Sequence, residues 1–161
     1  MTKRRTMLAG GILGAIWSLF VVWLPGQGPQ PFIPINLALI YAFVPGGVVM
    51  LLVVLRIAER RFFSDALMDG DALAPGSPAE IDQRVLSNTM EQMVLAVLLW
   101  PFAITFLGSV TVIAMGLAMG VARVAFWIGY HVSPPLRIFG WAASFYPTVL
   151  ATAWSLWRLV T

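Results

Sequence analysis

Residues 92–122 read QMVLAVLLWPFAITFLGSVTVIAMGLAMGVA, and no charged side chain interrupts them. A membrane-spanning helix needs about 20 apolar residues, so this stretch can supply most of two spans, with a tight turn at Gly108. Glu91 and Arg123 border the stretch. If the two spans form a hairpin, both charges enter the membrane from the same side. A charge at that depth costs roughly 2.5–3.5 kcal/mol on insertion scales, which marks this pair as a candidate functional site.

The composition of the whole chain indicates an integral membrane protein. Apolar residues make up 60% of the 161 residues, charged residues make up 11%, and the mean hydropathy is +0.87. Soluble domains are about 45–50% apolar and about 25% charged. The absence of Cys excludes disulfides, thiolate metal sites and a cysteine nucleophile. The single histidine, His131, argues against a metal centre built from histidines, and the alternation typical of a membrane β-barrel is missing.

Five apolar segments predict an all-α membrane protein. They run over residues 7–24, 35–55, 84–107, 109–131 and 135–157. The first is too long for the core of a signal peptide, and no cleavage pattern follows it, so we interpret it as an uncleaved span. The predicted organisation is residues 1–34, a helix with an external turn, and residues 35–161, a four-helix membrane domain. Gly116 and Gly120, four residues apart, predict close helix packing in the fourth segment.

The basic residues predict the orientation by the positive-inside rule. With a cytoplasmic N-terminus, nine of the 10 Lys and Arg residues fall on or near the cytoplasmic side, and only Arg158 lies outside. The net charge of +3 is therefore explained by topology, the C-terminus lies outside, and a bacterial inner membrane is the expected location. The long loop over residues 57–83 is cytoplasmic, and its acidic residues are interpreted as parts of a solvated linker. They are Glu59, Asp65, Asp69, Asp71, Glu80 and Asp82.

One face of the third span carries three polar side chains. Arg84, Asn88 and Glu91 stand at positions i, i+4 and i+7, which share a helix face. Because this span enters from the cytoplasm, Glu91 lies about 10 Å deeper than Arg84 at 1.5 Å per residue.

The fourth span returns to the cytoplasmic side with a matching face. Arg123 stands seven residues before Tyr130, so it lies at about the depth of Glu91. This match predicts an ion pair between Glu91 and Arg123 on facing helices. Arg137 follows at the start of the fifth span, and together these side chains predict a polar pocket that opens to the cytoplasm.

A structural role is the alternative interpretation. The two deep charges could be a buried ion pair that fixes helix register, and Arg84 and Arg137 could extend to the membrane surface. Tyr130 could belong to the aromatic belt at the interface. Asn88 fits this interpretation less well, because an amide inside the membrane needs a partner. The convergence of so many polar side chains exceeds what helix register requires.

A small zwitterionic peptide with two carboxylates and one amine fits such a pocket. Guanidinium groups bind carboxylates, a carboxylate binds an ammonium group, and an asparagine bridges amides. Glutathione is such a peptide, and it would supply the thiol that the chain lacks. An arginine beside that thiol would lower its pKa from about 8.5 and favour the nucleophilic thiolate.

Two motifs resemble the MAPEG family, the membrane-associated proteins of eicosanoid and glutathione metabolism. RVLSNTME at residues 84–91 is similar to the R-x3-N-x2-E motif of the family. ARVAFWIGY at residues 122–130, followed by Arg137, resembles its second signature, in which an Arg, an aromatic or His position, a Tyr and a later Arg recur at this spacing. The resemblance covers roughly residues 35–157.

The resemblance implies a four-helix membrane bundle that assembles as a homotrimer, with glutathione between neighbouring subunits near the cytoplasmic face. The implied glutathione contacts are Arg84, Asn88, Glu91 and Tyr130. Arg123 would support Glu91 or the carboxylates of the peptide. Arg137 matches the arginine that stabilises the thiolate and is the expected catalytic residue. Arg60 or Arg61 would match basic residues of the family's first cytoplasmic loop.

The sequence also departs from the family pattern. Residues 7–24 add a span before the usual four helices, and the loop over residues 62–83 is longer than expected. Phe126 stands where the eicosanoid synthases carry Tyr or His, and Ile138 follows Arg137 where the prostaglandin-forming branch has Ser. These differences argue against a leukotriene or prostaglandin substrate.

Three functions remain open at this point. The first is a membrane-bound glutathione-dependent transferase or peroxidase that acts on hydrophobic electrophiles or lipid hydroperoxides. The second is a non-catalytic family member that binds lipid or a partner in the same groove. The third is a membrane scaffold whose polar pair is purely structural.

Overall fold

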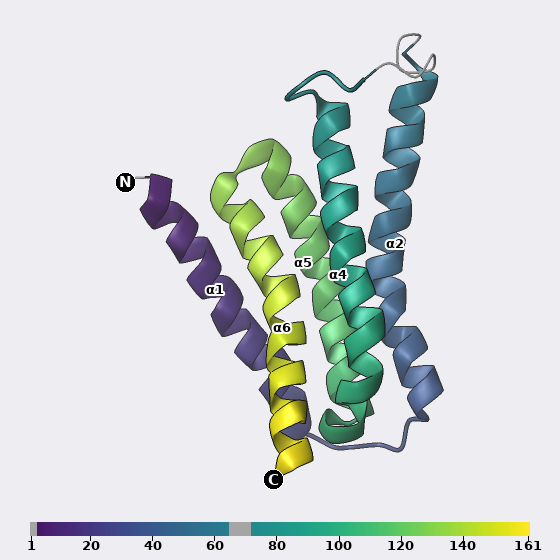
Figure 1. Cartoon of the computed structure of the whole chain (residues 1–161), viewed down its shortest axis with the longest axis vertical. Coiled ribbons are helices and arrows are strands. Elements are labelled where there is room, and N and C mark those ends of the chain that lie inside the picture. Colours follow the sequence, from purple (N-terminus) through teal and green to yellow (C-terminus); the bar gives the residue numbers. More distant parts are fainter. Residues whose placement is uncertain (1–2, 65–71) are drawn as a thin grey trace.

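The computed structural model describes residues 3–64 and 72–161, and throughout these residues it contains helices and no strand (Figure 1). The elements are α1 (Lys3–Trp23), the 3-10 turn η1 (Leu24–Gln27), α2 (Ile35–Phe62), α4 (Pro78–Leu107), α5 (Ser109–Val132) and α6 (Pro134–Val160). The prediction of an all-α membrane protein is confirmed.

Four segments are long and apolar enough to cross a membrane: α1 with η1, α2, α4 and α5. The remaining long helix, α6, has 27 residues, about 40 Å at 1.5 Å per residue, whereas the hydrocarbon core is about 30 Å thick. Its buried face carries mostly small and hydroxyl residues. They are Gly140, Ala142, Ala143, Ser144, Pro147, Thr148, Ala151 and Ser155. The protein is therefore a multi-pass membrane protein with four to five spans.

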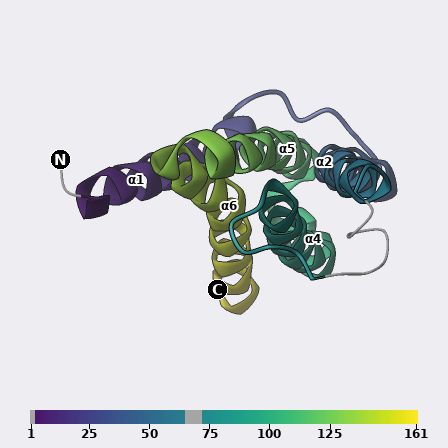
Figure 2. The ribbon, with the colours of Figure 1, turned by 90° about the horizontal axis from the view of Figure 1, so that it is seen from above.

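The long helices α2, α4, α5 and α6 alternate in direction along the bundle (Figure 1). The start of α1, the end of α2, the start of α4 and the α5–α6 turn lie at one end, and the C-terminus lies at the other. Seen from above, α1 and α2 lie at opposite sides of the molecule (Figure 2). α5 contacts α2, α4 and α6, while α1 packs mainly on α6. Because α5 contacts both α4 and α6, residues of these three helices lie near one another at the end that holds the α5–α6 turn.

Glycines bring α5 close to its neighbours. Gly116 and Gly120 lie against Ala42 and Pro45 of α2, and a β-carbon at either glycine would overlap them. Gly140 of α6 approaches the backbone of α5 just as closely. The close packing predicted for Gly116 and Gly120 is confirmed.

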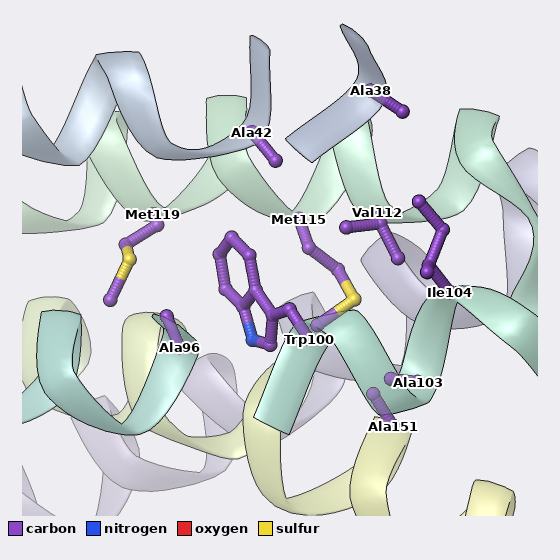
Figure 3. Close-up of a cluster of buried hydrophobic side chains, with 10 residues drawn as sticks. All are labelled: Ala38, Ala42, Ala96, Trp100, Ala103, Ile104, Val112, Met115, Met119 and Ala151. Atoms are coloured by element: carbon purple, nitrogen blue, oxygen red, sulfur yellow. The ribbon is translucent and has the colours of Figure 1, made fainter. Parts of the chain in front are cut away.

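Trp100 of α4 is the largest side chain of the main core and is only 1% exposed (Figure 3). Its ring stacks on Phe43 of α2 with the ring centroids 5.8 Å apart. Its indole nitrogen donates a hydrogen bond of 3.1 Å to Thr148 Oγ1 of α6. A buried tryptophan whose N–H is paired combines a large apolar contact with a polar anchor, and here it joins three helices at one level.

Both helices that flank the predicted loop extend into it. Residues 57–83 were expected to form a loop, but α2 continues to Phe62 and α4 begins at Pro78. Ser77 caps α4, because its hydroxyl oxygen accepts a hydrogen bond from the backbone N–H of Glu80. Both ends of the predicted loop are therefore helical.

The linker interpretation is wrong for Asp82. This residue lies in α4 and is fully buried, and side chains of two other helices pair its carboxylate. Glu59 pairs with Arg56, and Glu80 pairs with Arg84, both at the surface. The other acidic positions of the predicted loop, Asp65, Asp69 and Asp71, lie outside the described residues.

Candidate functional site

A pocket of about 360 Å³ lies between α4, α5 and α6, at the end of the bundle that holds the α5–α6 turn. Its lining residues are Asn88, Phe126, Tyr130, Arg137, Ile138 and Trp141. Three residues singled out in the sequence therefore meet here from three different helices. They are Asn88 of α4, Tyr130 of α5 and Arg137 of α6.

The α5–α6 turn explains why Tyr130 and Arg137 meet. Pro134 and Pro135 begin α6, where a missing backbone N–H costs little. Gly129 of α5 lies so close to the backbone of Arg137 that a β-carbon would overlap it. The guanidinium carbon of Arg137 consequently lies 4.8 Å from the centroid of the Tyr130 ring. This cation–π contact holds the arginine at the pocket wall.

Glu91 and Arg123 do not form the direct ion pair that their common depth predicted. Arg123 Nη1 donates to Asn88 Oδ1 at 2.9 Å, and Asn88 Nδ2 donates to Glu91 Oε2 at 3.3 Å. The prediction of a direct pair is wrong because positions i and i+3 differ by roughly 60° around a helix, so Asn88 faces α5 while Glu91 turns outward. The asparagine bridges the two charges.

Arg123 is 0% exposed, yet its guanidinium is only partly paired. Its central carbon lies 4.0 Å from the centroid of the Phe126 ring, and its one hydrogen bond goes to Asn88. Nε and Nη2 have no hydrogen-bond partner among residues 3–64 and 72–161. Unpaired donors on a buried cation are unusual, and they mark a position where a further acceptor would stabilise the site.

Arg84 lies apart from the pocket. It is exposed on α4, and its Nη2 pairs with Glu80 Oε1 at 2.7 Å. Glu91 is also exposed on α4 but remains linked to the pocket through Asn88. The structure thus brings together Asn88, Tyr130 and Arg137, connects Arg123 and Glu91 to them, and leaves Arg84 on the outer face.

Sequence reasoning missed a second polar cluster. The buried carboxylate of Asp82 accepts hydrogen bonds from Arg60 Nε and Trp127 Nε1, each at 2.8 Å. It also lies 3.2 Å from His131 Nε2. Arg60, which the resemblance matched to a cytoplasmic-loop residue, therefore lies on α2 and binds Asp82, while Arg61 is exposed.

Gln92 of α4 was also missed. It is 4% exposed, and within the part of the chain that the structure describes neither its amide oxygen nor its amide nitrogen has a hydrogen-bond partner. Residues 82, 85, 89, 92 and 96 are all buried and follow the helical period, so they form the inner face of α4. That period was readable in the sequence, and it would have placed Asp82 and Gln92 inside the bundle and Glu91 outside.

The sequence matches the model of the MAPEG family over residues 37–157. This region contains α4 and α5 completely and most of α2 and α6, whereas α1 lies outside it. Searches of curated proteins and of solved structures find no match. The resemblance inferred from the two motifs is confirmed, and it supports a membrane protein of glutathione or eicosanoid metabolism. The chain belongs to the MAPEG family.

Proposed function

We propose that the protein is a membrane-bound glutathione-dependent transferase or peroxidase that acts on hydrophobic electrophiles or lipid hydroperoxides. The observation that carries this proposal is the pocket in which Asn88, Tyr130 and Arg137 meet. It combines a hydrogen-bonding amide, a phenol and a guanidinium in one pocket at the end of the bundle that holds the α5–α6 turn.

Asn88 has capacity left for a ligand. Its amide oxygen accepts one hydrogen bond from Arg123, and its amide nitrogen donates one to Glu91. An asparagine side chain offers two donors and two acceptor sites, so one of each remains. The remaining donor and acceptor of Asn88 can pair with the C=O and N–H of a peptide bond in glutathione. The carboxylate of Glu91 can pair with the ammonium group of the same peptide.

The exposure of Glu91 supports a homotrimer with the ligand between subunits. Glu91 lies deeper in the membrane than Asn88, yet its side chain is exposed on the outer face of α4. A carboxylate that faces lipid costs several kcal/mol, which a neighbouring subunit or a bound ammonium group would remove. Arg84 is exposed on the same helix, near the cytoplasmic end, where it could reach a ligand held at that interface.

Arg137 is the proposed catalytic residue. It lies in the first turns of α6, where the positive end of the helix dipole adds to its charge, and both favour a thiolate. With an electrophile, the sulfur of this thiolate forms a bond to carbon, and the leaving group departs with its electron pair. With a hydroperoxide, the sulfur takes the terminal oxygen and an alcohol is released. A second glutathione then converts the sulfenic acid to a disulfide and water.

The distribution of charge supports a cytoplasmic site. The helix ends that carry Arg4, Arg56, Arg60 and Arg137 lie at the pocket end of the bundle, whereas Arg158 ends α6 at the other (Figure 1). By the positive-inside rule the pocket faces the cytoplasm, which contains glutathione, and a bacterial inner membrane fits this orientation.

Thiolate absorbance in the ultraviolet tests the catalytic assignment. Wild-type protein mixed with glutathione in detergent at neutral pH should show the thiolate band, and Arg137→Ala should abolish it while glutathione still binds. Arg158→Ala, at the opposite end of the same helix, is the matched control and should leave the band unchanged. An undiminished band in Arg137→Ala would refute the role of this residue.

A non-catalytic protein that binds lipid or a partner in the same groove is the second candidate. The apolar part of the pocket wall, which includes Ile138 and Trp141, favours it. This candidate predicts saturable binding of lipid with no thiolate band in the presence of glutathione.

A further inference from the structure

A second pocket, of about 380 Å³, lies between α2 and α5, at the end of the bundle that holds the α5–α6 turn (Figure 1). Its lining includes Arg56 and Arg60 of α2 on one side, and Trp127, Ile128 and His131 of α5 on the other. It shares no lining residue with the pocket described above. The side chains that line it are therefore available for a separate ligand.

Asp82 of α4 also lines this pocket, but its carboxylate is not presented to a ligand. The residue is fully buried, and both of its oxygens are paired. Oδ2 accepts a hydrogen bond from Arg60, while Oδ1 accepts one from Trp127 and lies 3.2 Å from His131 Nε2. Asp82 thus fixes these three side chains from inside the bundle, and its charge is balanced by Arg60.

The donors that remain lie at the outer ends of the two arginines. Arg60 binds Asp82 through Nε, and within the described residues its two terminal nitrogens have no partner. Arg56, one helical turn earlier, uses Nη1 for a surface pair with Glu59 at 3.2 Å, and its other nitrogens have no partner in the same part of the chain. Two guanidinium groups one turn apart, each with unused N–H groups beside a pocket, form a site for an anion such as a phosphate group.

An exposed apolar strip leads from this pocket toward the other end of the bundle. On α5, Ile128, Val124 and Val121 stand at positions i, i−4 and i−7, so they share one helix face, and all three are exposed. On α2, Leu52 lies one turn before Arg56 and is also exposed. The pocket therefore combines a cationic head region with an apolar path into the membrane.

We propose that this pocket binds an anionic phospholipid from the membrane leaflet at the same end of the bundle. The phosphate lies between Arg56 and Arg60, and the acyl chains lie along the strip that begins at Ile128. Basic pockets between membrane helices are typical sites for anionic headgroups, and a tryptophan such as Trp127 is common at headgroup level. Because the buried Asp82 holds Arg60 in place, the site is organised before the lipid arrives.

This lipid is a bound component of the protein and not a substrate. It contacts α2 and α5 together, and because it binds the folded bundle it stabilises that state by mass action. Phosphatidylglycerol should therefore raise the unfolding temperature of the protein in detergent more than phosphatidylcholine does. Neither glutathione nor the thiolate site takes part, so the proposal stands or falls independently of the proposed function.

Native mass spectrometry of the full-length protein in detergent tests the site, with phosphatidylglycerol and phosphatidylcholine of identical acyl chains as probes. Wild-type protein should bind phosphatidylglycerol about tenfold more tightly than phosphatidylcholine. Arg56→Gln should weaken phosphatidylglycerol binding about fivefold, the effect of one basic residue near an anionic lipid, and leave phosphatidylcholine binding unchanged. Arg61→Gln is the matched control, because it removes the same charge from an exposed position of α2 that does not line the pocket. It should change binding less than about twofold.

A second variant should bind the anionic lipid more tightly. Glu59→Gln releases Arg56 Nη1 from its surface pair and removes a negative charge beside the pocket, so phosphatidylglycerol affinity should rise about twofold or more. Glu80→Gln, which breaks a surface pair on α4 and does not line the pocket, is its control and should leave the affinity unchanged. These two variants keep the test valid if Arg56→Gln is poorly folded.

Three results would overturn the proposal. Equal binding of the two lipids by wild-type protein would show that the pocket does not recognise an anionic head. Equal losses in Arg56→Gln and Arg61→Gln would show a general attraction of lipid to a basic helix end. Displacement of phosphatidylglycerol by an equal concentration of glycerol 3-phosphate would show that the pocket takes a free phosphate compound and has no preference for a lipid.

Discussion

Two polar networks join helices at the same end of the bundle, and they differ in how completely their members are paired. The carboxylate of Asp82 is buried and contacts three donors from α2 and α5. In the other network, Arg123 is equally buried but has, among the described residues, one hydrogen bond and two unpaired nitrogens, and Glu91 remains exposed. A completely paired network stabilises a fold, whereas an incomplete one at a pocket has capacity for a ligand.

The largest effect on stability is expected from Asp82→Ala. This change leaves the half-buried side chains of Arg60 and Trp127 without their shared acceptor, and it should cost about 3 kcal/mol of unfolding free energy, because two hydrogen bonds to a charged group are lost at about 1.5–3 kcal/mol each. Glu59→Ala, which breaks a surface pair on α2, should cost under about 1 kcal/mol. Thermal unfolding in detergent measures both. Similar losses in the two variants would show that the buried Asp82 network stabilises the fold no more than a surface ion pair does.

Trp127→Phe should have an intermediate effect. It removes one donor to Asp82 and keeps most of the apolar surface, so the loss should be about 1.5–3 kcal/mol, the range for hydrogen bonds to charged groups. The same unfolding measurement applies. Glutathione affinity of the folded fraction should equal that of the wild type, and a parallel fall in affinity would show that the Asp82 network belongs to the ligand site.

Arg123→Met should change stability little and binding strongly. Replacing an incompletely paired buried charge by an apolar side chain of similar length is often close to neutral for folding. Asn88 and Glu91 lose the group that orients them, so the dissociation constant for glutathione should rise about tenfold or more. Calorimetric titration together with thermal unfolding measures the two effects. A loss of stability as large as that of Asp82→Ala, with unchanged glutathione affinity, would show that the Arg123 network stabilises the fold and does not serve the ligand.

The smallest effect on folding is expected from Arg84→Ala. Its pair with Glu80 is exposed, so the unfolding temperature should shift less than in any of the other variants. Glutathione affinity should nevertheless fall, because the proposed contact is made by this exposed guanidinium. An unchanged affinity would show that the family role of this position does not apply here.

The sequence predicted the features that depend on local composition and on helix rise. Hydropathy located the helices, and the rise per residue placed Glu91 and Arg123 at a common depth on neighbouring helices. Depth alone does not decide which side chain faces the neighbouring helix, because Asn88 and Glu91, at positions i and i+3, differ by roughly 60° around α4. The direct ion pair was wrong for that reason, although Asn88 still connects the two residues.

The Asp82 network was not predictable from any one segment. Its donors come from α2 and α5, far from Asp82 in sequence, and they meet only when three helices pack. The family motifs located Asn88, Tyr130 and Arg137, whose meeting follows from the α5–α6 turn.

Calorimetric titration of wild-type protein and of Asn88→Leu with glutathione, both in the same detergent, tests the central claim most directly. Asn88 is the bridge between the two charges and a wall of the pocket. We predict a saturable heat of binding for the wild type that is lost in Asn88→Leu while the variant remains folded. No binding heat in the wild type, or equal heats in the two proteins, would contradict the assignment of this pocket to glutathione.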